Sequence, residues 1–169
     1  NIFISNNISE GSVFIEFGAG IVSTRELGKL YNLWSVEQHL PFCGLYKNVN
    51  YIYAPIVNGW HDTKILKEKL PKKSACVLID GPTKHAPAGR GLESRTLMKQ
   101  NMDLFDKDSM FIFHDTNRSD EKNLAEEISS ILGKKIVHYT QGDYYSVILN
   151  AFATPATAKQ VTTMAKAGK

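Results

Sequence analysis

The sequence predicts an α/β fold with a doubly wound, mostly parallel sheet and a C-terminal antiparallel hairpin. Three observations lead to this prediction. Short β-rich runs alternate with helical patterns along the chain, as expected of parallel strands joined by crossover helices. Residues 75–79, Ala-Cys-Val-Leu-Ile, are continuously apolar, which is typical of a strand buried on both faces. The first strand enters a turn with two glycines, Gly18 and Gly20, and such turns often lead from strand to helix in this class.

The first half of the chain alternates between strand and helix patterns. Strands are expected where β-formers and apolar residues gather, at residues 12–17, 32–36 and 50–54. Pro55 stops the third strand, because proline cannot continue a hydrogen-bonded ladder. Helical patterns follow the first and third strands, at residues 24–30 and 63–70. A short helical or irregular stretch lies between the second and third strands.

The second half continues the alternation and then changes to a hairpin. The strand at 75–79 is followed by a loop at 83–91, which is rich in proline, glycine and basic residues. A helix at 93–105, a strand at 110–113 and a helix at 120–132 come next, with Gly133 as the C-cap of the last helix. Residues 135–139 and 144–149 flank the turn Gln141-Gly142-Asp143 and form the terminal hairpin.

The composition indicates one folded domain. The chain has 169 residues, 43% hydrophobic and 22% charged, which is enough for one core. No apolar run approaches the ~20 residues of a membrane span. We expect residues 1–150 to form the domain, and residues 151–169, rich in Ala, Thr and Lys, to be disordered or to dock on a partner. Cys43 and Cys76 do not form a disulfide framework, so we place the protein in the cytoplasm.

The charge distribution bears on the choice of partner. The net charge is +3, and the tail holds three lysines and no acid, so residues 1–150 carry equal numbers of basic and acidic side chains. Nucleic-acid binding requires basic residues gathered on the folded surface, and this composition disfavours it. A small molecule or a glycan is the expected partner, and a homo-oligomer is compatible with the sequence.

Residues with chemical potential follow the predicted strands one after another. In a doubly wound sheet, ligands bind at the carboxyl ends of the strands, at the topological switch point. The residues placed there are Glu16-x-Gly18-x-Gly20, Glu37, Ala54-Pro55, Asp80 and His114-Asp115. This alignment predicts a ligand site along one edge of the sheet.

Glu16 indicates the kind of ligand. A carboxylate beside a helix N-terminus does not help to bind a pyrophosphate, but it suits a ligand with a cationic amine and no phosphate. A dinucleotide fingerprint also needs a third glycine at position 23, where this chain has Ser23. These two features favour S-adenosylmethionine over NAD.

Glu37 is the candidate for contact with a ribose. It lies 19 residues after Gly18, the position of an acid that binds ribose hydroxyls; the alternative is a solvated strand-end acid. Gln38 is a candidate for the edge of the adenine ring.

Four segments resemble the class I S-adenosylmethionine-dependent methyltransferases. They are Val-Phe-Ile-Glu-Phe-Gly-Ala-Gly, Trp-Ser-Val-Glu, Val-Leu-Ile-Asp-Gly-Pro and Phe-Ile-Phe-His-Asp-Thr. The resemblance runs from about residue 12 to 150 and is closest in pattern to small-molecule and sugar O-methyltransferases. It implies a Rossmann-like fold that uses S-adenosylmethionine. It also implies that Glu16 and the turn Gly18-Ala19-Gly20 hold the methionine end, Glu37 the ribose, and the segments with Ala54, Pro55 and Asp80 the adenine.

Asp80, His114 and Asp115 are the candidates for catalysis. Asp80 and Asp115 end neighbouring strands, and paired carboxylates bind hard cations such as Mg²⁺. Metal-dependent O-methyltransferases resemble this pattern, but His114 stands where they commonly have another acid, and imidazole suits other divalent metals better. A general base is the second role for His114, since neutral imidazole removes a hydroxyl proton well near pH 7. The alternative is that these residues cap loops and orient their neighbours.

Further residues near the expected site leave alternatives open. His85, Arg90 and Arg95 are candidates for contacts to an anionic or polyhydroxylated substrate, or are solvated loop charges. Trp60 either stacks on a ligand ring or is a core aromatic. We expect methyl transfer to a hydroxyl of a small molecule or sugar. The competing hypotheses are an NAD-dependent oxidoreductase and a non-catalytic scaffold module that keeps the fold.

Overall fold

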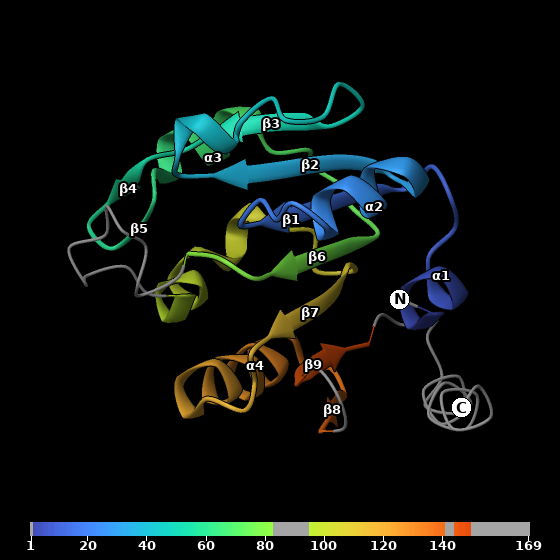
Figure 1. The fold of residues 1–169 in the computed structure, drawn as a ribbon. Coiled ribbons are helices and arrows are strands. Elements are labelled where there is room, and N and C mark those ends of the chain that lie inside the picture. Colours follow the sequence, from blue (N-terminus) through green and yellow to red (C-terminus); the bar gives the residue numbers. More distant parts are fainter. Residues whose placement is uncertain (1, 83–94, 141–143, 150–169) are drawn as a thin grey trace.

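Helices cover both faces of a seven-stranded sheet (Figure 1). The computed structural model describes residues 2–82, 95–140 and 144–149. The strands of this sheet are β1 (Val13–Phe17), β2 (Asn32–Glu37), β3 (Asn50–Tyr53), β6 (Cys76–Ile79), β7 (Met110–His114), β8 (Ile136–Tyr139) and β9 (Tyr145–Ile148). The helical segments are α1 (Ile2–Asn7), α2 (Ser23–Leu30), η1 (Leu40–Phe42), α3 (Thr63–Lys69), η2 (Arg95–Leu104) and α4 (Ser119–Leu132).

The strand order confirms the predicted doubly wound sheet. The order is β3-β2-β1-β6-β7-β9-β8. Neighbours from β3 to β7 pair in parallel, and β9 runs antiparallel between β7 and β8. The chain moves outward in one direction from β1 to β3 and then returns to the other side of β1 at β6. The switch point therefore lies between β1 and β6, where ligands bind at the carboxyl ends of the strands.

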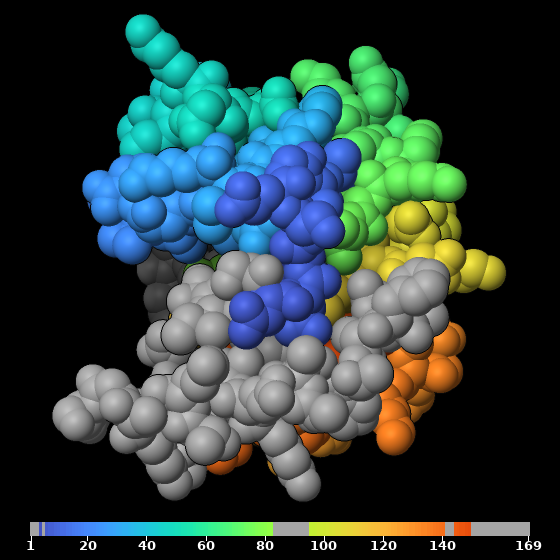
Figure 2. All heavy atoms as spheres, turned by 90° about the vertical axis from the view of Figure 1, so that its right-hand side faces the viewer, coloured from blue at the N-terminus to red at the C-terminus, as the bar shows by residue number. Residues whose placement is uncertain are grey.

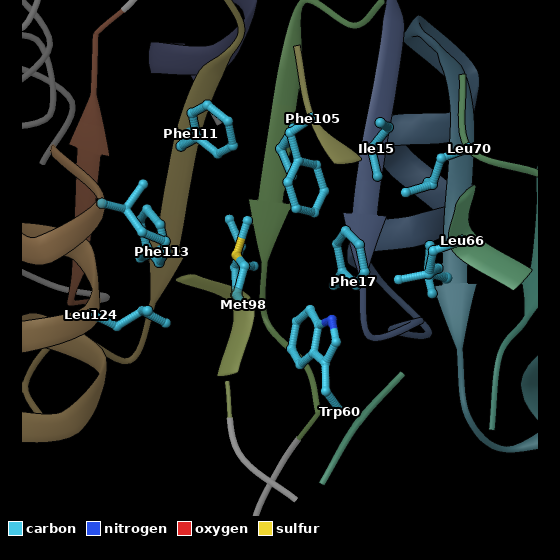
Figure 3. Packing of buried hydrophobic residues seen from close by; sticks show 14 of the residues in the cluster. Ile15, Phe17, Trp60, Leu66, Leu70, Met98, Phe105, Phe111, Phe113 and Leu124 are labelled. Atoms are coloured by element: carbon cyan, nitrogen blue, oxygen red, sulfur yellow. The ribbon is translucent and has the colours of Figure 1, made fainter. Parts of the chain in front are cut away.

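Two hydrophobic clusters hold the layers together. On one face, strand residues such as Ile15, Phe17 and Phe113 pack against α3, η2 and α4 (Figure 3). On the other face, Phe14 and its neighbours pack against α1 and α2. Successive side chains of a strand point to opposite faces, so β1 contributes to both clusters. Cys76 is completely buried in the second cluster, as its strand pattern predicted.

Two short elements were missed by the sequence analysis. The first is α1, whose Ile4 and the following Ile8 are buried in the second cluster. Figure 2 shows the blue N-terminal segment across the face where the parallel strands begin, away from their carboxyl ends. The second is an antiparallel pair, β4 (Ile56–Val57) and β5 (Trp60–His61). Asn58 and Gly59 join them with φ of 54° and 87°, as in the turn that Asn-Gly favours.

The segment after β6 differs from the predicted helix at 93–105. Its described part, η2, is a 3₁₀ segment with non-helical backbone at Asn101. The Asn101 amide donates to the carbonyl of Leu97 at 3.1 Å, which supports this break. The predicted helix at 120–132 is confirmed as α4, and Gly133 caps it in the left-handed region at φ 62°. The predicted loop at 83–91 and the tail at 151–169 lie outside the described residues. Within the described residues, no helix is long and apolar enough to cross a membrane.

The ends of β1 and β6 meet backbone to backbone at the switch point. Gly18 has φ 91°, and a Cβ there would lie 2.9 Å from the Gly81 nitrogen. A Cβ on Gly81 would lie 2.8 Å from the Gly18 Cα. Both positions therefore require glycine, one of them for conformation as well as for space. This contact sets the turn after β1 directly against Asp80-Gly81.

We predict that Gly18→Ala lowers the free energy of unfolding by about 3 kcal/mol, from left-handed strain plus the backbone clash. Gly11→Ala is the matched control, because Gly11 has φ 77° and nothing within 4 Å of its Cβ position. It is expected to cost only about 1 kcal/mol of strain. Urea unfolding measures both variants, and equal losses would contradict the close contact.

Candidate functional site

The predicted site residues lie at the carboxyl ends of β1, β2, β3, β6 and β7. These ends point to the same edge of the sheet, toward the left in Figure 1. Register places Glu16 level with Ser35 on β2 and with Leu78 on β6. The site has two parts, an acid-supported glycine turn after β1 and a cluster of charged groups after β6 and β7.

Glu16 lies buried beneath the glycine turn. Its Oε2 accepts hydrogen bonds from Thr24 Oγ1 at 2.6 Å and from Ser35 Oγ at 3.1 Å. Its Oε1 is buried without a hydrogen-bond partner among the described residues. Burial raises the pKa of the Glu16 carboxyl from 4.5 to about 7, although the neighbouring hydroxyls act in the opposite direction. Glu16 is thus poised between its neutral and charged forms near neutral pH.

Thr24 links this acid to the turn. The Gly20 N–H donates to Thr24 Oγ1 at 2.8 Å, and the Thr24 hydroxyl donates to Glu16. Sequence reasoning missed both Thr24 and Ser35. Ser35 could have been found from the register of β1 and β2, which places it beside Glu16. Thr24 carried a weaker signal, a hydroxyl in the first turn of the helix that follows the glycines.

Glu37 ties the same turn to the end of β2. Its Oε2 accepts from the Ala19 N–H at 3.0 Å, and its Oε1 accepts from the His39 N–H at 2.7 Å. Each carboxylate oxygen has a second acceptor position, so Glu37 can still accept hydrogen bonds from a ligand. Beside it, Gln38 Oε1 and His39 Nε2 are buried without hydrogen-bond partners among the described residues. Unpaired buried polar atoms are uncommon in folded proteins, and a bound ligand or water can satisfy them.

The third strand end forms a packed border rather than a polar one. Ala54 is completely buried, and its N–H donates to the Glu37 carbonyl at 2.9 Å. The adjoining Pro55 is half-buried, and its carbonyl accepts from Asp62 N–H at 2.9 Å. Trp60 is 2% exposed and stacks on Phe17 with ring centroids 5.5 Å apart (Figure 3). Of its two interpretations, Trp60 is therefore the core aromatic.

The second part of the site is a compact cluster of Asp80, His114 and Asp115. His114 Nδ1 lies 3.0 Å from Asp80 Oδ1 and 3.3 Å from Asp115 Oδ1. Asp115 follows β7 with φ 61°, an uncommon conformation for a residue with a side chain, and one that recurs at functional sites. The hydrogen bond to Asp80 raises the pKa of the His114 imidazole above its ordinary value. All three residues were predicted from the sequence, and the fold brings them together.

Arg95 lies within this cluster and does not face solvent. Its side chain is 3% exposed. The guanidinium donates to the carbonyls of Asp80, Pro82 and His114, and its Nη2 lies 3.4 Å from Asp80 Oδ1 and 3.3 Å from Asp115 Oδ2. The interpretation of Arg95 as a solvated loop charge is therefore wrong. His85 and Arg90, the other two candidates of this kind, lie outside the described residues.

Asp80, His114 and Asp115 are also the candidate ligands for a divalent cation. One ligand atom each from Asp80, His114 and Asp115 lies within 4.8 Å of the others, which is close enough for a shared ion. Mg²⁺ prefers oxygen ligands in octahedral geometry, whereas this set includes an imidazole. Arg95 contacts oxygens of both carboxylates, and Arg118 lies 3.1 Å from Asp115 Oδ2. The contacts do not fit Mg²⁺ well, and a cation at Asp80 and Asp115 stays a prediction.

Comparison with known proteins gives the fold and no close relative. No family profile and no curated protein matches the chain. Solved structures do match. A methyltransferase from Pyrococcus furiosus has a TM-score of 0.56 and 17% identity, over 87% of this chain and 78% of that one. A protein described as a ribosomal RNA methyltransferase from Plasmodium falciparum has a TM-score of 0.54 and 14% identity, over 84% and 87%.

A third similar structure contains ligands. It is the MycE methyltransferase of the mycinamycin biosynthetic pathway, in complex with Mg, SAH and mycinamycin VI. Its TM-score is 0.55 at 10% identity, and the match covers 88% of this chain and 44% of that chain. At these identities the likeness is one of fold.

We predict that Glu16→Gln changes the pH dependence of stability. A raised pKa in the folded state stabilises the fold below about pH 4.5, and this contribution is lost as pH rises through 7. Gln does not titrate, so the variant lacks this loss. Between pH 4.5 and 8, its free energy of unfolding should rise by about 3 kcal/mol relative to that of the wild type.

Urea unfolding across this pH range measures the effect of Glu16→Gln. Glu68→Gln, at an exposed position on α3, serves as the matched control. If both variants keep a constant difference from the wild type at every pH, Glu16 does not titrate as its burial requires.

Proposed function

We propose that this chain, which has the class I S-adenosylmethionine-dependent methyltransferase fold, transfers a methyl group from S-adenosylmethionine to a hydroxyl of a small molecule or sugar. The observation that carries the proposal is the hydrogen-bonded chain from the Gly20 N–H through Thr24 to the buried Glu16. These hydrogen bonds place a carboxylate beneath the glycine turn at the switch point. A carboxylate there suits a ligand that carries an amine and disfavours a pyrophosphate.

The residues present fit this methyl donor. Glu16 Oε1 and Gln38 Oε1 are buried acceptors without partners among the described residues, and the donor's two amino groups would satisfy such atoms. We assign Glu16 and the turn at Gly18, Ala19 and Gly20 to the methionine end, and Glu37 to the ribose. Gln38 would border the adenine, together with Ala54, Pro55 and Asp80. When bound, S-adenosylmethionine supplies an electrophilic methyl group on its sulfonium.

We assign removal of the acceptor's proton to His114. If His114 Nδ1 carries the hydrogen that Asp80 accepts, Nε2 keeps the lone pair that a general base needs. Asp80 would then fix the imidazole and stabilise its protonated form, which is the role of an orienting acid beside a histidine base. Methyl transfer asks little further chemistry of a protein beyond alignment of the reacting atoms and exclusion of water.

Several competing functions are weaker on the same observations. A buried acid beneath the turn opposes the pyrophosphate of NAD, and Ser23 stands where its fingerprint needs glycine. A ribosomal RNA methyltransferase is among the similar folds, but residues 1–150 have no excess of basic side chains. A scaffold role without a ligand does not account for the unpaired acceptors Glu16 Oε1 and Gln38 Oε1. We also place the protein in the cytoplasm.

A divalent cation is the alternative activator of the hydroxyl. It would bind Asp80 and Asp115, lower the pKa of the acceptor hydroxyl and fix its position. The MycE structure contains Mg, which gives this alternative a precedent in the fold. The His114 contact and the guanidinium contacts of both acids favour the base over the metal.

We predict that S-adenosylhomocysteine binds the wild type and that Glu37→Gln weakens this binding roughly 10- to 100-fold, since hydrogen bonds to a charged acceptor are lost. Isothermal calorimetry measures both affinities, and Glu68→Gln is the control for an exposed acid. Thermal unfolding of Glu37→Gln shows that the fold persists. Binding of NAD without any response to S-adenosylhomocysteine would refute the proposed function.

We predict a rate that rises with pH through a pKa above 6.5, because His114 must be neutral to accept a proton. His114→Gln should lower the rate roughly 10²- to 10⁴-fold, and Asp80→Asn should shift the acid limb to lower pH. The rate is measured as the formation of S-adenosylhomocysteine. The substrate is the hydroxyl compound that gives the highest rate in a panel of small molecules and sugars. An acid limb unmoved by Asp80→Asn would contradict this assignment.

A further inference from the structure

The acidic pair Asp80 and Asp115, at the ends of β6 and β7, contacts the guanidinium group of Arg95. A single guanidinium nitrogen, Arg95 Nη2, lies 3.4 Å from Asp80 Oδ1 and 3.3 Å from Asp115 Oδ2. This is not a surface ion pair, because the Arg95 side chain is 3% exposed. The nitrogen therefore bridges the two carboxylates that were predicted to bind a metal.

Backbone carbonyls fix this guanidinium in place. Arg95 donates to the carbonyls of Asp80, Pro82 and His114 as well as to the carboxylates. Arginine offers five donors in a rigid planar fork, and here the fork joins the end of β6 to the end of β7. These three contacts oppose any movement of the Arg95 side chain away from the acids.

Among the described residues, the two acids already contact two guanidinium groups in addition to His114. Asp80 and Asp115 supply two negative charges, and Arg95 and Arg118 contact them with two positive ones. Glu121 lies farther out, 3.9 Å from Arg118. A divalent ion shared by both acids requires oxygens within about 2.0–2.6 Å, so it would compete with Arg95 Nη2 for the same oxygens and be repelled by its charge.

We propose that Arg95 takes the place of a divalent metal ion between Asp80 and Asp115, so that the site activates the acceptor hydroxyl through His114 without a metal. This inference rests on the proposed methyl transfer. Arg95 is a positioning residue: it neutralises the two acids and holds Asp80 where it contacts His114 Nδ1.

Metal titration of the intact chain tests this proposal without any acceptor. Mn²⁺ binding, followed by electron paramagnetic resonance and calorimetry, should show no saturable site in the wild type tighter than on the order of 1 mM. Arg95→Gln removes the charge and should create one site, at least about tenfold tighter than any in the wild type. Added Mn²⁺ should also raise the melting temperature of Arg95→Gln.

Two further variants separate charge from structure. Arg95→Lys loses the planar fork but keeps the positive charge, so it should be destabilised without gaining Mn²⁺ affinity. Combining Arg95→Gln with Asp80→Asn should abolish the gained site. A merely structural role of Arg95 predicts equal metal behaviour for the Gln and Lys variants, and that result would overturn the proposal.

The wild type alone decides the case if Arg95→Gln does not fold. A single Mn²⁺ site tighter than on the order of 1 mM that Asp80→Asn removes would show that the acids bind metal despite Arg95. The absence of such a site supports the proposal. S-adenosylhomocysteine calorimetry in the presence of EDTA tests the proposed function separately, because it measures binding of the cofactor product with no free metal ion present.

Discussion

The site depends on one backbone contact, the approach of Gly18 to Gly81 at the switch point. Because neither residue has a side chain, the turn after β1 lies directly against the turn after β6. This contact joins two chemically different walls. One wall is the acid-supported glycine turn on Glu16, and the other is the charged cluster around Asp80. A larger residue at either glycine would separate the two walls, and the proposed methyl transfer requires that they stay close.

Two buried ionisable groups, Glu16 and Arg95, support these walls by different physical means. Burial disfavours the charged form of either group. Glu16 responds through its pKa, which rises to about 7 while hydroxyl donors bind one of its oxygens. Arg95 is instead surrounded by carbonyls and carboxylates that accept hydrogen bonds from its guanidinium. The wall at Glu16 thus responds to pH through a buried acid, whereas the wall at Asp80 is held by a hydrogen-bonded guanidinium.

Much of the fold could be predicted from the sequence because hydrophobic periodicity and turn residues report local structure. The strand at 75–79 and the C-cap at Gly133 are examples, and both are present in the structure. The missed elements are short. The pair β4 and β5 has two residues in each strand, too few for a periodic pattern, although Asn58-Gly59 marked its turn. The break at Asn101 escaped notice because the apolar pattern of the segment continues through it.

The site shows the same division. By itself the sequence determined which residues end the strands, and so it placed Glu16, Asp80 and His114 at one edge of the sheet. Strand ends follow from pattern alone, since parallel strands share an edge. Only the tertiary structure decided the partners of these residues: Thr24 for Glu16, and Arg95 for the acids at β6 and β7. The physical reason is that a side-chain contact depends on register and on the path of the connecting chain, so an arginine read as a solvent-facing loop charge can be a buried cation instead.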